Sequence, residues 1–344
     1  MKKIVGIIAA LAMAGAVFAV DFSAGFQLKA DLFHYDGATE GVSAMKLWNE
    51  NTKDDKPFIF SLNSDRVGAT FKFYDGAAGK LGSALEGHAY NIWFKPFDAV
   101  KIDLGSQDIA LNKEHVTWWK GNIIGGKMTS FFDNTWGSGI GDWGYKATFN
   151  SDGFTVAAAL LSADNTAWMS KAKDGDAAIG ETVLYAGYAA DFGNVNFVLD
   201  AKNTFKNLKI AAGYSGSFGD VSIFTDVMFW KWEDKQNILS VDFDARTSID
   251  SIGLEAYFNW GAPLKDMSSD NMRLACYAKA SYGIAGGSLF LKFEDDNLMA
   301  KKFAADFTFG YDGNLGAMSY EVAAAINVAD KTSFSIPCYF RIGF

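Results

Sequence analysis

Histidine and cysteine, which most often perform acid–base, nucleophilic or metal chemistry, are scarce in this sequence. The three histidines are His34, His88 and His115. None lies in a His-Glu-x-x-His or Gly-x-Ser-x-Gly setting. Gly137-Ser138-Gly139 lacks the strand–turn–helix context of a nucleophile elbow, and Cys276 and Cys338 have no metal-ligand or redox spacing. We therefore expect no enzymatic activity, no metal and no cofactor.

Charged residues of both signs recur at every second position and predict the lining of a water-filled interior. The candidate pore-lining residues are Lys29, Lys101, Asp103, Asp242, Asp244, Arg246, Glu255, Arg273, Lys279 and Arg341. Such charges bias the passage of ions without binding them tightly. The alternative is that they only pair across strands and keep a wall solvated.

The segment 107–142 gathers aromatic residues among charged ones. Its candidates for a constriction loop are Trp118, Trp119, Asp133 and Trp136. Aromatic rings of this kind could guide sugars by stacking, whereas the alternative is that they pack the loop or form an interface belt. A further hairpin through 116–119 and 123–130 competes with a loop folded into the lumen.

The elements that must position these residues are strands, because period-two alternation dominates the chain. From Val20 to Leu32 every second residue is apolar, and the same pattern runs from Phe334 to Phe344. Pro337 interrupts the last segment because it removes a ladder donor. An amphipathic helix would place its charges at spacings of three and four instead.

The connections alternate in length, with eight short turns and nine longer segments, of which 35–56 and 107–142 are the longest. The short turns are expected at 63–66, 95–98, 150–153, 191–194, 215–220, 248–251, 283–287 and 311–315. This pattern predicts an all-β transmembrane antiparallel barrel of about eighteen strands, and it is compatible with any number from sixteen to twenty strands. Closure follows because hydrocarbon cannot satisfy a free sheet edge. Phe149, Phe154, Phe192, Phe218 and Phe344 fall at strand ends where an aromatic girdle belongs.

The amino terminus has the pattern of a secretory signal peptide. Lys2 and Lys3 precede an apolar run and Val17-Phe18-Ala19, which predicts a signal peptide over 1–19 and a barrel over 20–344. The formal charge of −9 becomes −11 when those two lysines are removed. An acidic chain without a basic cluster does not fit a nucleic-acid binder.

The terminal Ile-Pro-Cys-Tyr-Phe-Arg-Ile-Gly-Phe resembles the assembly signal of Gram-negative outer-membrane proteins, and the whole pattern resembles the general diffusion porins. Asn91 to Asp98 is similar to a turn in porins of spirochaete type. The resemblance implies that barrel-assembly machinery recognises Phe340, Ile342 and Phe344. It also implies an outer-membrane location among lipids, a homotrimer and passive diffusion of small hydrophilic solutes and ions.

A closed-lumen surface barrel, acting as an adhesin or structural outer-membrane protein, is the alternative function. The external connections are mostly short, which argues against a large binding head. The sequence does not fix the solute, the ion selectivity, the oligomeric state or the source organism.

Overall fold

The computed structural model describes residues 19–23, 25–47, 58–75, 85–106, 143–161, 169–171, 177–202, 206–231, 237–265, 267–268 and 272–343. The strands are β1 (Ala19–Ser23), β2 (Gly25–Asp36), β3 (Gly41–Leu47), β4 (Phe58–Asn63), β5 (Val67–Asp75), β6 (Leu85–Phe97), β7 (Val100–Ser106), β8 (Trp143–Ser151), β9 (Phe154–Leu161), β10 (Met169–Lys171), β11 (Ala177–Ile179), β12 (Thr182–Ala190), β13 (Gly193–Lys202), β14 (Asn207–Phe218), β15 (Val221–Lys231), β16 (Ile238–Ile249), β17 (Ile252–Pro263), β18 (Arg273–Ile284), β19 (Gly287–Asp295), β20 (Ala305–Leu315), β21 (Met318–Val328) and β22 (Ser333–Gly343). Across the ranges described, no helix has the length and apolar character needed to span a membrane.

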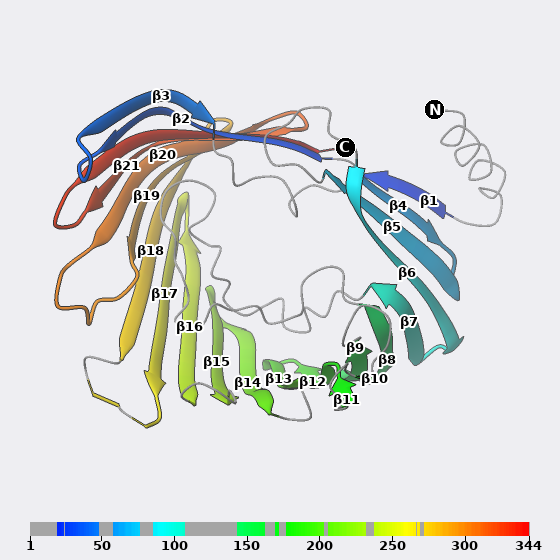
Figure 1. Ribbon diagram of the computed structural model, residues 1–344. Coiled ribbons are helices and arrows are strands. Elements are labelled where there is room, and N and C mark those ends of the chain that lie inside the picture. The colour runs from blue at the N-terminus through cyan, green and yellow to red at the C-terminus, as the bar shows by residue number, and fades with distance from the viewer. Residues whose placement is uncertain are drawn as a thin grey trace.

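The strands pair antiparallel with their neighbours in chain order and are arranged as a ring (Figure 1). β4 pairs in turn with β5, β6, β7, β8 and β9, and the series continues from β12 to β22. β10 and β11 form a separate two-stranded hairpin in the connection between β9 and β12. Period-two sequences therefore build one continuous wall.

The first strand closes the ring. β2 pairs with β22 from Gly25↔Gly343 to Tyr35↔Phe334, and on its other side it pairs with β3. β1, which lies one residue before β2, pairs with β4. The sheet holds twenty strand segments, and joining β1 to β2 and β3 to β4 leaves eighteen strands in the described ring. The predicted antiparallel barrel of about eighteen strands is confirmed.

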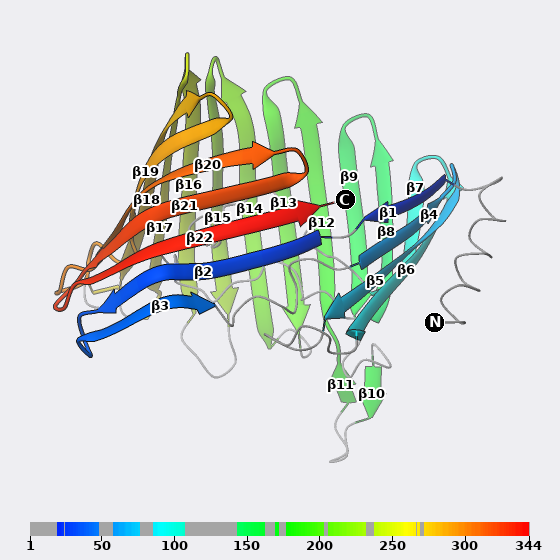
Figure 2. The same ribbon diagram turned by 90° about the horizontal axis from the view of Figure 1, so that it is seen from above.

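One rim of the barrel consists of short turns, which Figure 2 shows as tight hairpins along one end of the strands. We call this the short-turn rim, and it comprises 64–66, 98–99, 152–153, 191–192, 219–220, 250–251, 285–286 and 316–317. Six of these lie within the predicted turns, and a seventh, 98–99, overlaps the predicted turn 95–98 at Asp98. The eighth prediction, at 311–315, was wrong because Gly313 and Asn314 still pair with β21, and the chain turns at Gly316 with a φ of 60°.

The prediction of one long loop over 35–56 was also wrong. The chain turns tightly at 37–40 and returns as β3, which pairs with β2 from Asp36↔Gly41 to Ala30↔Leu47. Met45 has a φ of 53°, in the left-handed region, and it falls where the alternation of β3 breaks down. That irregular pattern is why the sequence does not present β3 as a strand.

Pro337 lies where the ladders on both sides of β22 are irregular. On one side β2 has a bulge between Asp31 and Phe33, beside Asp31↔Pro337. On the other side the pairing with β21 passes from Val322↔Cys338 to Ala325↔Ser335 without including Pro337. Proline lacks an amide hydrogen, so a break in the ladder is where β22 can hold it.

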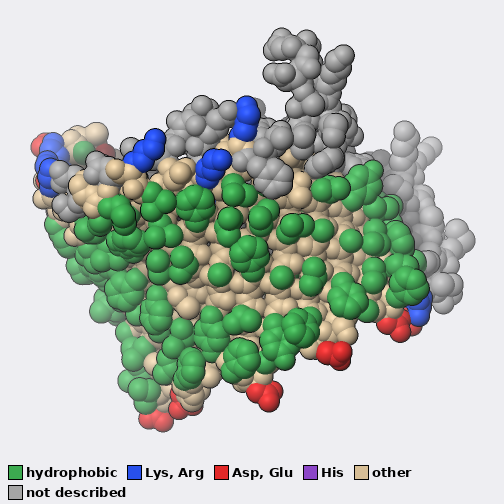
Figure 3. Space-filling model, turned by 90° about the horizontal axis from the view of Figure 1, so that it is seen from below, with side chains coloured by type: hydrophobic (Ala, Val, Ile, Leu, Met, Phe, Trp, Pro, Cys, Tyr) green, Lys and Arg blue, Asp and Glu red, His purple; other side chains and the backbone are tan. Residues whose placement is uncertain are grey.

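The outer face of the ring is an apolar belt (Figure 3). Large side chains at alternate positions are exposed on it, such as Phe197, Phe243, Leu254, Leu291 and Phe309. Acidic side chains gather along one edge of the belt and Lys and Arg along the other (Figure 3). An outward apolar belt between polar edges is the surface that a bilayer requires.

The predicted aromatic girdle forms near the short-turn rim. Phe149, Phe154, Phe192 and Phe218 are exposed there. Tyrosines join them: the rings of Phe154 and Tyr188 are 4.3 Å apart, and the Tyr214 hydroxyl donates to the Phe192 carbonyl at 2.6 Å. Phe344, the fifth predicted member, lies outside the described residues.

Candidate lumen wall

The alternate residues of each strand face the lumen, and many are polar but buried. On β16, Ser240, Asp242 and Asp244 are buried while Phe243 between them is exposed. The same alternation appears on β15 and β17 and from β19 to β21. The register across β15–β21 arranges these side chains in rows that run around the wall.

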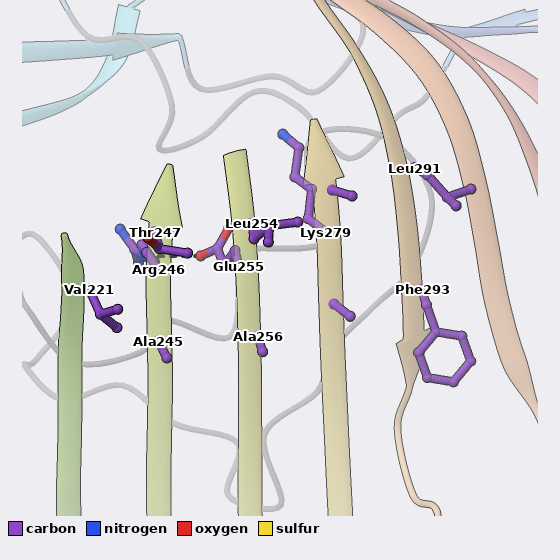
Figure 4. A pocket seen from close by; sticks show the side chains of 12 residues that line it. Val221, Ala245, Arg246, Thr247, Leu254, Glu255, Ala256, Lys279, Leu291 and Phe293 are labelled. Atoms are coloured by element: carbon purple, nitrogen blue, oxygen red, sulfur yellow. Dashed lines mark ion pairs between the residues drawn. The ribbon is translucent and has the colours of Figure 1, made fainter. Parts of the chain in front are cut away.

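The first row, which we call the mixed row, contains charges of both signs. Arg246 lies opposite Glu255, Glu255 opposite Lys279, and Lys279 opposite Lys292 on successive strands β16–β19. Figure 4 shows the Arg246 and Glu255 side chains meeting in an ion pair, with Nε and Oε1 3.0 Å apart. Glu255 therefore lies between two bases.

The next row, which we call the acidic row, contains carboxylates and tyrosines without a base. Asp244 lies opposite Tyr257, Tyr257 opposite Tyr277, Tyr277 opposite Glu294, and Glu294 opposite Asp306. Beyond it, Asp226 lies directly opposite Asp242 on β15 and β16. Asp226 and Asp242 therefore face each other across β15 and β16, and Glu294 and Asp306 face each other across β19 and β20.

Hydrogen bonds hold several of these carboxylates in place. The Tyr257 hydroxyl donates to Asp242 Oδ1 at 2.6 Å, and Asn259 Nδ2 donates to the same oxygen at 2.8 Å. Asn327 Nδ2 donates to Asp306 Oδ1 at 2.9 Å. The Arg246 guanidinium donates to Asp244 Oδ2 from Nη2 at 2.8 Å. These hydrogen bonds fix the positions of Asp242, Asp244 and Asp306 in the wall.

Several lumen bases lie over an aromatic ring as well as beside a carboxylate. The cation-to-centroid distances are 5.2 Å for Lys101 over Trp93, 5.0 Å for Lys209 over Trp230, 5.0 Å for Arg246 over Phe224 and 4.9 Å for Lys279 over Phe290. The matching ion pairs are Lys101–Asp103 at 2.8 Å, Lys209–Asp200 at 3.6 Å, Arg246–Asp244 at 2.8 Å and Lys279–Asp312 at 3.8 Å. Each of these bases is therefore partly neutralised within the wall.

The predicted pore-lining residues lie in four places. Asp242, Asp244, Arg246, Glu255 and Lys279 come together on β16–β18, as the rows above describe.

Two others, Lys101 and Asp103, pair with each other on β7, well apart from that group in the order of the ring. Arg273 is placed at the opposite end of β18 from the short-turn rim and bonds to Asp296, so it belongs to a loop connection.

The remaining two predicted residues, Lys29 and Arg341, lie at the seam between the first and last strands. Lys29 pairs with Tyr339 and Arg341 with Gln27, so their backbones are diagonal neighbours, and the Arg341 side chain is exposed. The constriction-loop candidates Trp118, Trp119, Asp133 and Trp136 lie outside the described residues. Phe340 and Ile342 lie on β22 as expected.

Several wall residues were missed by the sequence prediction. Tyr257, Tyr277 and Phe290 face the lumen and are buried, and the sequence prediction did not name them as wall residues. Asp312 was assigned to a turn and instead faces Glu321 across β20 and β21. The period-two pattern could have identified the three aromatic residues, because each lies two positions from a charged residue on the same face: Glu255, Lys279 or Lys292.

The outer side of β16–β18 carries an apolar groove of about 410 Å³. Ala245, Ala256 and Ala278 lie in one register row there, with Leu291 and Phe293 alongside. These five residues occupy the lipid-facing phase of their strands. Arg246, Glu255 and Lys279 of the mixed row also line the groove (Figure 4).

Chemically, the lumen wall can attract and repel ions. Across the ranges described, no three His, Cys, Asp or Glu side chains are grouped closely enough to hold a metal ion. Cys276 and Cys338 are both free and buried. Carboxylates lining a barrel interior bias ion passage through their field.

Solved structures with the same architecture are bacterial outer-membrane proteins. The fold is porin-like. OpdQ of Pseudomonas aeruginosa matches 94% of this chain and 98% of its own, with a TM-score of 0.53 and 8% identity. A BenF-like porin of Pseudomonas fluorescens Pf-5 matches 95% and 100%, with a TM-score of 0.52 and 10% identity.

A third porin-like structure is OpdK of Pseudomonas aeruginosa, which matches 94% of this chain and 98% of its own at a TM-score of 0.51 and 11% identity. No family model and no curated protein sequence matches the chain. At these identities the likeness lies in the fold.

Proposed function

We propose that this protein is an outer-membrane porin through which small hydrophilic solutes and ions diffuse passively. The observation that carries the proposal is the ring of eighteen strands with an apolar outer face and a charged inner face. Barrels of sixteen to eighteen strands leave an aqueous channel, whereas eight-stranded barrels fill their interior with side chains.

The outer surface supports a location in the outer membrane. Every backbone group in hydrocarbon must be bonded within the protein, and a closed ring achieves this without an edge. The aromatic residues near the short-turn rim suit the boundary between hydrocarbon and head groups. In this proposal, membrane lipids surround the belt and the protein performs no catalysis.

Export and assembly complete the proposal. Residues 1–19 act as a cleaved signal peptide and residues 20–344 form the mature barrel, which associates as a homotrimer. The alternating residues Phe340, Ile342 and Phe344 are recognised by barrel-assembly machinery. Amino-terminal sequencing of protein from outer membranes tests the cleavage, native mass measurement tests the trimer, and deletion of Phe344 tests the recognition.

The decisive experiment is single-channel recording from the purified protein in a planar lipid bilayer. We expect discrete conductance steps that grow with salt concentration, and swelling of liposomes in solutions of small sugars. Folded protein that inserts but conducts no current at any voltage would contradict the porin function. It would favour the closed-lumen adhesin or structural barrel.

A further inference from the structure

We propose that the pore favours cations over anions, and that two pairs of opposed carboxylates in its wall set this preference. The pairs are Asp226 with Asp242 and Glu294 with Asp306. This inference rests on the proposed porin function, and it names the class of solute that the same pore prefers.

The first argument is the register. Asp226 is directly opposite Asp242 across β15 and β16, and Glu294 is directly opposite Asp306 across β19 and β20. Like charges directly opposite each other destabilise an antiparallel sheet. If the wall only had to remain solvated, a base or a neutral polar residue could occupy one of the two positions in each pair. The repetition of the arrangement indicates a function for the negative charge.

The second argument is the charge balance of the wall on β15–β21. The lumen acids there are Asp226, Asp242, Asp244, Glu255, Glu294, Asp306, Asp312 and Glu321, and the bases are Arg246, Lys279 and Lys292. Each base lies within 4 Å of one of these carboxylates and offsets it, so the acids still outnumber the bases by eight to three. The net field toward the lumen is negative.

The third argument is the environment of Glu294. Its side chain is 3% exposed, and neither carboxylate oxygen accepts a hydrogen bond within the part of the chain that the structure describes. Its ion pair is with Lys292, whose Nζ lies 3.6 Å from Oε2. A buried carboxylate with so few donors is under-satisfied, and an approaching cation relieves it.

The arrangement suits passage rather than capture. Conduction requires a site that is favourable enough to enter and weak enough to leave. The carboxylates lie in pairs along the wall, and no group of three that could hold a metal ion occurs among the described residues. Because the carboxylates are packed into the wall, they act on a passing ion through their field, which is screened less than that of charges in open water.

The test is the reversal potential of the pore in a KCl gradient, from about 1 M to about 0.1 M, where the Debye length is ~3 Å and ~10 Å. We expect the parent to give a potassium-to-chloride permeability ratio above one. The double variants D226N/D242N and E294Q/D306N each lower this ratio, and the fourfold variant brings it to one or below. The control D191N/D220N removes two exposed charges from the short-turn rim, where salt screens them more strongly, and lowers the ratio less than either paired variant does.

Each outcome decides between the possibilities. A conducting parent without cation preference, or paired variants that keep the parent ratio, would overturn this inference alone. A parent that does not conduct would overturn the porin function together with it. Heat-modifiable migration shows which variants are folded, and the single variants D226N and E294Q replace any double variant that fails to fold.

Discussion

At the scale of single residues, the lumen wall depends on small residues lying beneath large rings. Phe290 is buried against Ala323 and Tyr339, directly opposite Gly310 on the next strand. A β-carbon added to Gly310 would lie 2.5 Å from Phe290 Cζ and 2.8 Å from the Val322 carbonyl oxygen. The backbone on that side cannot move without disturbing the ladder, so glycine is required.

We therefore expect Gly310→Ala to destabilise the barrel by about 1–3 kcal/mol, the usual cost of overpacking a filled interior. The measurement is the urea concentration or temperature at which the heat-modifiable band is lost. Gly283→Ala is the matched control, because the nearest atom to its new β-carbon is 3.7 Å away. Equal stability of the two variants would contradict the packing argument.

Arg246 neutralises two acids of the wall, Asp244 and Glu255. Arg246→Met leaves Asp244 fully buried without that cation. Breaking such a pair costs about 3–5 kcal/mol when both groups are buried, but Arg246 is 45% exposed, so we expect about 1–2 kcal/mol. Adding Asp244→Asn should recover part of the loss in urea unfolding. A double variant less stable than Arg246→Met would count against this coupling.

The sequence was sufficient to place the charges but not to assign their partners. Asp242, Asp244, Arg246 and Glu255 could be assigned to one face because period two is a local property of the chain. The register between strands decides that Asp242 faces Asp226 and not a lysine. No short segment of the sequence specifies this register. Phe290 was missed because hydrophobicity alone does not distinguish a ring facing lipid from one beneath a lysine.

At the scale of elements, strands were predictable where alternation was regular and were missed where it broke. β3 was assigned to a loop because its sequence alternation breaks down, at the position where Met45 adopts a left-handed conformation. Pro337 was recognised as a misfit, but the irregular ladders that accommodate it involve β2 and β21, which lie far away in sequence.

The position of Pro337 leads to a prediction about β22. Pro337→Ala should lower stability only slightly, because it leaves a small cavity at a buried position but breaks no regular ladder there. Ser335→Pro should strongly reduce the yield of folded barrel, because Ser335 pairs with both His34 and Ala325. For both variants the measurement is the fraction of protein that becomes heat-modifiable after refolding. Tolerance of proline at 335 would show that β22 does not need its full ladder.

At the scale of the whole molecule, ring closure can be tested by a covalent bond between the first and last strands. His34 and Ser335 are directly opposite each other on β2 and β22. Opposed residues in antiparallel strands have α-carbons about 4.5–5.5 Å apart, which a disulfide can bridge. We expect H34C/S335C, in a C276A/C338A background, to form a disulfide that raises the unfolding temperature.

The control for this cross-link is H34C/S240C in the same background, since Ser240 lies on β16, several strands away from β2 around the ring. It should remain reduced in the folded protein. A sheet that is open between β2 and β22 would give no cross-link in either variant, as judged by mobility with and without reductant.

The short-turn rim has an electrical consequence for the molecule as a whole. Asp65, Asp98, Asp152, Asp191, Asp220 and Asp250 are exposed in its turns, whereas Arg66 is the one base within those turns and is paired with Asp98. If the barrel is the proposed pore, we expect potassium to be enriched at this mouth in dilute salt, since the exposed acids at this rim outnumber its bases. Copies inserted in one direction should pass more current at one sign of voltage than at the other, and the asymmetry should fade as the Debye length falls to ~3 Å at about 1 M salt. The protein would act as a weak diode whose direction reports which end entered the bilayer first.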